Sequence, residues 1–225
     1  MVEPSTKHDK PGWFFRFRLW TSKLIYNLIF AILVRDGSWQ EALVASVAPK
    51  TNDRVLNFGL GGLSTVVSLA VRYPEATFIG VAPNAKGAEK MQRSVVRKQL
   101  GNLSVVDVAY SEKLPFDAGS FDTVLCILVL HDRPLVEKLG VVKEIVRVLR
   151  RGGTLYVADF DKPENHGEGG ILEFARRISG SAAVASHIDG SWTGILAKAG
   201  LAGVKRQSSH SVGIGRISIM RARKR

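Results

Sequence analysis

The stretch that decides the fold begins with a short apolar run and ends in glycines: Val55-Leu56-Asn57-Phe58-Gly59-Leu60-Gly61-Gly62-Leu63. The apolar run predicts a buried strand, and the residues after the glycines follow a helical pattern. Glycine permits a tight turn between the two elements and leaves the backbone open to close approach by a ligand. Taken alone, such a turn is also compatible with a plain strand-to-helix connection, and no Gly-Lys-Ser/Thr follows it to indicate a P-loop.

After Pro49, short apolar runs alternate with helical patterns, which is typical of a parallel sheet covered by helices on both faces. The predicted strands span residues 55–58, 77–81, 105–108, 123–128, 154–159, 204–208 and 216–221. The predicted helices span residues 38–47, 63–72, 86–100, 134–150, 171–178 and 192–199.

Size and composition fit one globular domain, because 225 residues with 45% hydrophobic content can bury one core and are few for two. The single cysteine, Cys126, lies in an apolar run and is expected to be a buried core residue. One cysteine allows no disulfide within the chain, which fits a cytoplasmic location.

The formal net charge of +12 is concentrated near the C-terminus. The last acidic residue is Asp189, and the 36 residues after it contain eight lysines and arginines. This segment is compatible with a solvated tail, with contact to an anionic lipid surface, and with nucleic-acid binding. Charge alone does not choose among them.

The N-terminal part changes character twice. Residues 1–12 are polar and rich in Pro and Gly, so we expect a disordered tail there. Residues 13–34 predict an amphipathic helix with Arg16, Lys23 and Asn27 on one face. It is either a lid over the substrate cleft or a peripheral membrane contact through its aromatic residues. Its apolar run, residues 24–34, is too short for a transmembrane helix, and no signal-peptide cleavage site follows.

Two later segments accompany the glycine turn: Leu114-Pro115-Phe116 followed by a polar turn and Ser120-Phe121-Asp122, and Leu149-Arg150-Arg151-Gly152-Gly153. With this spacing the chain resembles the class I S-adenosylmethionine-dependent methyltransferases, in particular the ubiquinone and menaquinone C-methyltransferase-like branch called methyltransferase type 11. The resemblance implies a Rossmann-like, doubly wound, mostly parallel seven-stranded α/β sheet with an antiparallel last strand. It also implies three regions: the tail 1–12, a helical lid or membrane-contact segment 13–50, and a methyltransferase-like domain 51–225.

The resemblance implies S-adenosylmethionine as cofactor, held at the carboxyl ends of the strands. Carried over by position, its amino-acid part lies over the glycine turn, its ribose at the end of the second strand, and its adenine beside the segment after the third. The candidate cofactor-binding residues are Asn57, Gly59, Leu60, Gly61, Gly62, Ala82, Asn84, Tyr110, Ser111, Glu112 and Leu128.

The sequence departs from the family pattern at four of the positions around this cofactor. Asn57 stands where Asp or Glu is usual, Leu63 where a third Gly is common, Ala82 where a ribose-binding carboxylate is expected, and Tyr110 where an Asp often meets the adenine. We expect Asn84 to supply a neutral replacement at the ribose and Tyr110 to stack on the adenine. The competing interpretation is a degenerate site on a fold that survives as a scaffold.

His131 and Asp159 lie at the ends of the fourth and fifth predicted strands, and they are the candidate catalytic residues. His131 is the candidate general base, because its ordinary pKa suits proton removal near neutral pH. The alternative for His131 is a hydrogen-bonded residue of the strand-to-helix turn. His166, His187 and His210 receive no role. No metal site is predicted, because no His or Cys at ligand spacing accompanies the later acidic residues.

The predicted function is in-line methyl transfer from S-adenosylmethionine to a small-molecule or lipid-like acceptor, by a cytoplasmic enzyme with a peripheral contact to an anionic membrane. A non-catalytic protein that binds membrane or a protein partner is the first alternative. An RNA methyltransferase is the second, and the lack of an Asn/Asp-Pro-Pro-Tyr-type motif after the fourth strand counts against nucleic acid as a substrate.

Overall fold

The computed structural model describes residues 37–59, 62–108, 113–131, 133–213 and 215–225. The predicted tail 1–12 and the amphipathic helix 13–34, with its lid or membrane contact, lie outside the described residues. Within the described part of the chain, no helix combines the length and the apolar character needed to cross a membrane.

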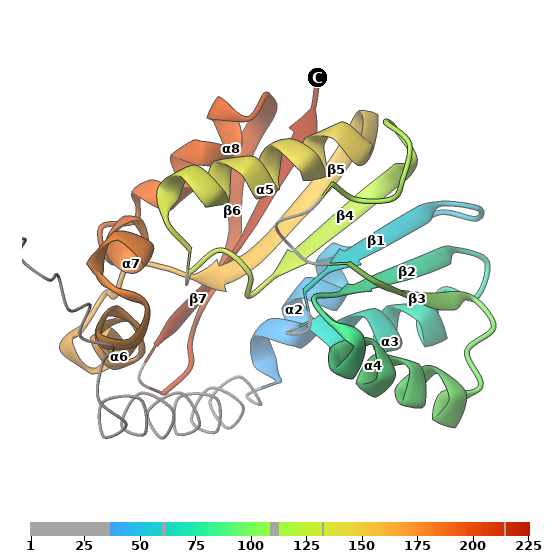
Figure 1. Ribbon diagram of the computed structural model, residues 1–225, viewed down its shortest axis with the longest axis horizontal. Helices are drawn as coiled ribbons and strands as arrows, with labels where there is room; N and C mark the ends of the chain where they lie inside the picture. The colour runs from blue at the N-terminus through green and yellow to red at the C-terminus, as the bar shows by residue number, and fades with distance from the viewer. Residues whose placement is uncertain (1–36, 60–61, 109–112, 132, 214) are drawn as a thin grey trace, which may run out of the picture.

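A seven-stranded sheet forms the centre of the protein (Figure 1), in the order β3-β2-β1-β4-β5-β7-β6. Neighbouring strands are parallel from β3 to β5, and β7 runs antiparallel to both β5 and β6. The predicted fold class is therefore confirmed. The strands are β1 (Arg54–Phe58), β2 (Thr77–Ala82), β3 (Leu103–Asp107), β4 (Phe121–Ile127), β5 (Leu149–Phe160), β6 (Leu201–Ser211) and β7 (Arg216–Lys224).

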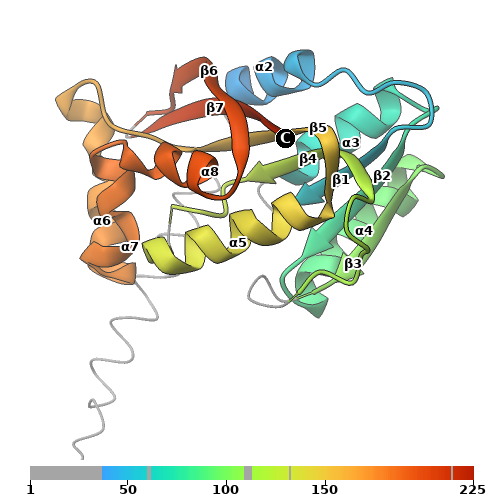
Figure 2. The same ribbon diagram turned by 90° about the horizontal axis from the view of Figure 1, so that it is seen from above.

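Helices cover both faces of the sheet, as Figure 2 shows from above. One face carries α2 (Ser38–Ser46), α3 (Leu63–Arg72) and α4 (Ala85–Lys98), and the other carries α5 (Leu135–Val148) and α8 (Gly194–Lys198). Two further helices, α6 (Gly170–Ser179) and α7 (Ser181–Ile188), lie together at the end of the sheet to which the β5 arrow points (Figure 1).

Two of these helical segments differ from the prediction. Helix α7 was not predicted, because its run of small residues lacks a strong amphipathic pattern and is enclosed by two loop-like glycines, Gly180 and Gly190. The predicted helix 192–199 is divided into a 3-10 turn, Ser191–Thr193, and the short helix α8.

The core consists of two apolar layers, one on each side of the sheet. Trp39 and Leu43 of α2 and Phe78 of β2 are completely buried in the first layer, and Ile145 of α5 and Trp192 in the second. Burying a side chain of this size contributes roughly 1.5–3 kcal/mol. The central strands are apolar on both faces, which is why their sequences are continuous apolar runs. The predicted burial of the free thiol is confirmed as well.

The strand order reverses between β1 and β4. Chain connections lead from β1 to β2 on one side and from β4 to β5 on the other, so the loops after β1 and β4 diverge from a crevice at their carboxyl ends. In open α/β sheets ligands bind in such a crevice. The glycine turn after β1 and the segment leading to His131 after β4 both lie there.

Candidate functional site

The glycine turn packs directly on the end of β4. Gly59 has a φ of +120°, and a Cβ there would lie 2.5 Å from the carbonyl oxygen of Ile127 and 2.6 Å from Cγ2 of Val129. A Cβ on Gly62 would meet Oδ1 of Asn57 and would lie 2.5 Å from Cδ1 of Ile127. Glycine is therefore required at Gly59 by the contact of the turn with the end of β4, and at Gly62 by the side chains of Asn57 and Ile127. Leu60 and Gly61 lie outside the described residues.

Asn57 holds this turn from inside. Its side chain is completely buried, and its Nδ2 donates a hydrogen bond of 3.0 Å to the carbonyl oxygen of Gly59. An ionised carboxylate, which is usual at this position in the family, cannot donate such a bond. The departure at Asn57 thus exchanges an acceptor for a donor and keeps the turn fixed. Its Oδ1 is buried and has no partner among the described residues.

Ala82 ends β2 and is completely buried, so it offers no polar group to a ribose. Asn84 is the N-cap of α4, where its Oδ1 accepts a hydrogen bond of 2.9 Å from the backbone N–H of Gly87. The residue paired with Ala82 on β3 is Asp107, which is exposed. Sequence reasoning missed Asp107, because its predicted strand continued to residue 108. An acidic residue at the carboxyl end of β3 was the available signal.

Leu128 adopts a left-handed conformation with a φ of +55° immediately after β4. This conformation costs roughly 1–2 kcal/mol for a residue with a Cβ. The N–H of Leu128 donates to the carbonyl oxygen of Ala158 at 2.9 Å, and the next two N–H groups, of Val129 and Leu130, turn toward Asp159. The strained residue thus redirects the chain so that the segment after β4 faces the end of β5.

The buried carboxylate of Asp159 accepts hydrogen bonds from these N–H groups. Its Oδ2 accepts from the N–H groups of Val129 and Leu130 at 3.1 and 2.7 Å, and its Oδ1 accepts from the N–H of Phe160 at 2.8 Å. The Nδ1 of His131 lies 2.8 Å from the same Oδ1. Burial alone would raise the pKa of Asp159, but His131 and the other donors outweigh it and lower that pKa to about 2.

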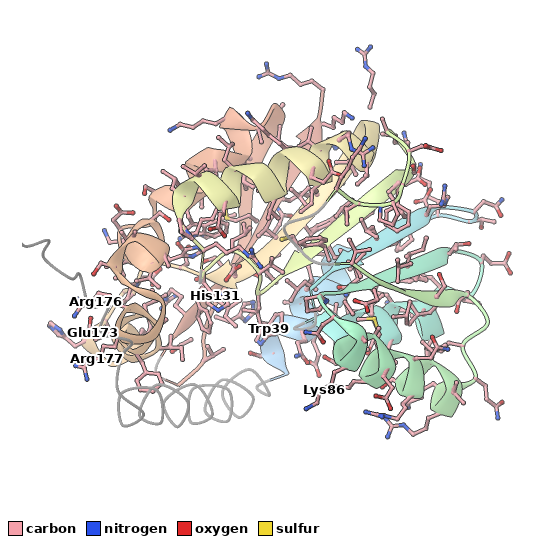
Figure 3. The ribbon with its side chains drawn as sticks, in the orientation of Figure 1. Trp39, Lys86, His131, Glu173, Arg176 and Arg177 are labelled. Atoms are coloured by element: carbon pink, nitrogen blue, oxygen red, sulfur yellow. The ribbon has the colours of Figure 1, made fainter. Side chains whose placement is uncertain are left out.

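His131 is also buried, and it lies between the sheet and the α6–α7 pair (Figure 3). Its ring packs edge-on against the ring of Phe160 with centroids 5.0 Å apart. Because an ionised Asp159 only accepts hydrogen bonds, Nδ1 of His131 carries a proton, and in the neutral form of the ring Nε2 is the basic nitrogen. Such a pair is chemically able to remove a proton from a hydroxyl or an acidic carbon. The two predicted catalytic residues are therefore brought into contact.

Further buried polar side chains surround this pair, and sequence reasoning assigned none of them to the site. His187 of α7 lies 6.5 Å from His131 between ring centroids and is stacked on Trp192 at 5.0 Å. Lys138 of α5 is completely buried and donates to the carbonyl oxygen of Ala183 at 2.8 Å. Neither was recognisable without α7, the helix that the sequence pattern did not reveal.

The adenine-edge candidates Tyr110, Ser111 and Glu112 lie outside the described residues, so their predicted contacts stay predictions. Across the described part of the chain, no group of three or more His, Cys, Asp and Glu side chains is placed to hold a metal ion.

Fold and crevice together define a Rossmann-like α/β protein, and comparison with known proteins shows which proteins it resembles. Residues 56–157 match the family model described as "Methyltransferase domain". The ubiquinone/menaquinone biosynthesis C-methyltransferase UbiE of Sinorhizobium fredii is 35% identical over 133 residues, which cover 56% of this chain and 49% of that protein. UbiE of Rhizobium etli is 31% identical over 130 residues, with the same coverage. The chain spans about half the length of the curated relatives it matches.

Solved structures share the fold at low sequence identity. PigF with SAH superposes with a TM-score of 0.70 at 16% identity, over 96% of this chain and 63% of that one. A SAM-dependent methyltransferase from Aquifex aeolicus has a TM-score of 0.61 at 18% identity, over 81% and 88%. The family-model match and the UbiE relatives confirm the resemblance to the S-adenosylmethionine-dependent methyltransferases of type 11, and the solved structures confirm the fold.

Polar groups near the crevice suit the cofactor that the resemblance implies. Oδ1 of Asn57 is a buried acceptor that packs against Gly62 and has no hydrogen-bond partner among the described residues, and an acceptor at this turn suits an ammonium group. Asn84 and Asp107 lie exposed at the ends of β2 and β3, and they can bond to ribose hydroxyls. S-Adenosylmethionine carries both kinds of group.

Proposed function

We propose that this chain is an S-adenosylmethionine-dependent methyltransferase acting on a small-molecule or lipid-like acceptor. One observation carries the proposal: the glycine turn touches the same segment that leads to His131. Val129, which closes the space at Gly59, gives its N–H to Asp159, and Asp159 bonds to His131. The glycine turn is therefore connected to His131, the proposed base, through only two intervening residues, Val129 and Asp159.

The cofactor supplies a methyl group already activated on a sulfonium. The chain's own residues then have three tasks. The turn from Gly59 to Gly62 holds the amino-acid part, and Asn84 with Asp107 binds the ribose hydroxyls. Asp159 keeps the proton of His131 on Nδ1, so that Nε2 takes a proton from the acceptor. The Asp159 carboxylate then stabilises the imidazolium. Alignment and the exclusion of water from this buried pair complete the catalytic requirement.

The relatives suggest which acceptor to test first. They are named for ubiquinone and menaquinone biosynthesis, so we propose a quinone precursor, methylated on carbon, as the first acceptor class. The comparisons support neither the RNA methyltransferase nor the non-catalytic scaffold alternative.

Two measurements test the proposal. Calorimetric titration with S-adenosylmethionine is expected to show stoichiometric binding to the purified chain. Incubation with S-adenosylmethionine labelled in the methyl group, and with a lipid extract of cells that lack their own UbiE, is expected to transfer label into the lipid fraction. His131→Asn keeps a hydrogen-bond donor for Asp159 but removes Nε2. It is therefore the matched control, in which no label is expected to be transferred. A chain that binds no cofactor contradicts the proposal.

The peripheral membrane contact is a separate part of this proposal. It is supported by basic side chains at the described C-terminal end, where Lys205, Arg206, Arg223 and Arg225 are exposed. Co-sedimentation of the full chain with anionic and with neutral vesicles tests it. Equal binding to both, or binding to neither, contradicts an electrostatic contact.

A further inference from the structure

His187 is a buried imidazole, and only one of its two nitrogens has a hydrogen-bond partner among the described residues. Its side chain is completely buried in α7, and its Nδ1 lies 2.5 Å from the carbonyl oxygen of Phe160. A carbonyl oxygen only accepts hydrogen bonds, so Nδ1 carries the proton. In the neutral ring, Nε2 is then an acceptor with a lone pair.

This Nε2 has no hydrogen-bond partner among the residues that the structure describes. Buried polar atoms in native proteins are nearly always paired, and an unpaired one calls for an explanation such as a ligand. A donor, either O–H or N–H, is what a lone pair of this kind requires. The missing partner is therefore a hydrogen-bond donor from outside the described chain.

The neighbours of His187 keep its ring neutral, so that Nε2 stays an acceptor. Burial lowers the pKa of His187, Asp159 raises it, and Lys138 lowers it further, to about 4 in total. Lys138 also fixes α7, because its Nζ donates to the carbonyl oxygen of Ala183 and to Oγ of Ser186 at 2.8 and 2.7 Å.

The ring is held firmly in its orientation on both sides. Trp192 stacks on it with an interplanar angle of 12°, and the indole N–H of Trp192 is fixed by Oδ1 of Asp161 at 3.0 Å. His131 lies on another side with its ring at 87° to that of His187. Both histidines bond through Nδ1 to consecutive residues at the end of β5, Asp159 and Phe160. The two imidazoles are thus anchored to adjacent residues, with their ring centroids 6.5 Å apart.

We propose that His187 binds the methyl acceptor, with its Nε2 accepting a hydrogen bond from a hydroxyl or N–H group of that molecule. His187 positions the acceptor beside His131 and selects against molecules of the same shape that lack a donor. The inference rests on the proposed function for the identity of the bound molecule, although the binding atom is testable without catalysis.

Two variants separate recognition from structure. His187→Asn places an amide nitrogen near Nδ1, which keeps the bond to Phe160 and removes Nε2. His187→Gln places a polar atom near Nε2 and gives up the bond to Phe160. Phenol is the probe, and toluene is the matched compound without a donor. Binding is followed by the NMR signal of the Trp192 indole N–H, and the state of the wild-type ring by the 15N signal of its Nε2.

We expect phenol, but not toluene, to shift the Nε2 signal of the wild type. We expect His187→Asn to bind phenol about tenfold more weakly, no better than toluene, and to unfold at a lower temperature because the stacking on Trp192 is lost. His187→Gln is expected to keep part of the preference for phenol. The inference is overturned if phenol leaves the Nε2 signal unmoved, or if His187→Asn keeps the full preference.

Calorimetry with S-adenosylmethionine on the same samples separates this inference from the proposed function. Cofactor binding without a phenol response overturns only the role of His187. A phenol response without cofactor binding overturns the methyltransferase proposal and supports His187 as a donor-binding residue. The wild-type 15N measurement needs no variant, so it decides the matter even if a substitution prevents folding.

Discussion

The Nδ1 atom of His131 lies 2.8 Å from Oδ1 of Asp159, and both side chains are buried at the carboxyl ends of β4 and β5. Three backbone N–H groups share the same carboxylate, so each oxygen of Asp159 has two donors. The carboxylate therefore does more than orient a histidine, because it also holds the segment that Leu128 redirects against the glycine turn.

Replacement of Asp159 by Asn is expected to damage both stability and function. Each oxygen of Asp159 accepts two hydrogen bonds, so in either orientation of the asparagine amide its NH2 group replaces one of these oxygens. The two buried donors that it faces then have no acceptor. We expect a loss of about 3 kcal/mol in the free energy of unfolding, measured by urea denaturation. The control is Asp117→Asn, which removes the same charge from an exposed position just before the start of β4. Equal stability of the two variants contradicts this role for Asp159.

The ionised Asp159 also predicts how the stability of the protein depends on pH. The folded-state pKa of Asp159, about 2, lies below its ordinary value, so its ionisation stabilises the fold above about pH 4 and this contribution is lost as the pH falls through 2. The asparagine side chain does not titrate. The stability difference between wild type and Asp159→Asn should therefore be constant near neutral pH and shrink by on the order of 2 kcal/mol toward pH 2. A gap that does not change with pH would rule out an ionised Asp159.

His131→Asn tests the proposed base. The amide retains a donor for Asp159, so the fold and the affinity for S-adenosylmethionine are expected to stay unchanged. Methyl transfer should fall by about 10²–10⁴, the usual contribution of a general base. Label transfer and cofactor calorimetry on one preparation provide both readouts. A rate of methyl transfer within a few-fold of wild type would mean that His131 is only a hydrogen-bonded residue of the turn after β4 and not the base.

The ribose site predicts a charge effect at a residue that the family pattern does not use. A charge-assisted hydrogen bond is worth about 1.5–3 kcal/mol, so Asp107→Asn should weaken S-adenosylmethionine binding roughly ten- to hundredfold by calorimetry. Asp117→Asn is again the control for charge. Asn84→Asp keeps the cap on Gly87 and adds a carboxylate near the ribose, so it should bind more tightly than wild type. Unchanged affinity in both variants would locate the ribose elsewhere.

Most of the sheet was predictable because its buried strands appear in the sequence as short apolar runs. Val55 to Phe58, the run before Gly59, is buried at every position and apolar at all of them except Asn57, as expected of a strand covered on both faces. The proximity of His131 and Asp159 was predictable from topology, since the carboxyl ends of neighbouring parallel strands lie together, whereas their hydrogen bond was not predicted.

Other features depend on tertiary contacts that no local pattern encodes. The donor role of Asn57 appears only when its amide reaches Gly59, and the left-handed Leu128 is held by bonds to β5. Helix α7 has small residues that carry little periodic signal, and its place is fixed by Lys138, a residue 45 positions earlier than Ala183. His187 therefore had no recognisable partner in the sequence.

Glu168 and Glu173 form a natural pair for a last prediction about stability. Hydrogen bonds from an arginine lower the pKa of each to about 2, from Arg216 for Glu168 and from Arg176 for Glu173. Glu168 is buried and ties the loop after β5 to the start of β7. Glu173 is on α6, with its side chain 44% exposed, and Figure 3 shows it with its arginines on the outer side of that helix.

Because breaking a buried ion pair leaves a charge uncompensated, Glu168→Gln should cost about 3 kcal/mol. For a chain of this length that lowers the Tm by roughly 6–12 °C. Glu173→Gln removes an exposed pair that water and salt already screen, so its Tm should change by less than about 2 °C. Scanning calorimetry at neutral pH checks both variants. Equal shifts would mean that burial does not decide how much each of the two carboxylates contributes to stability.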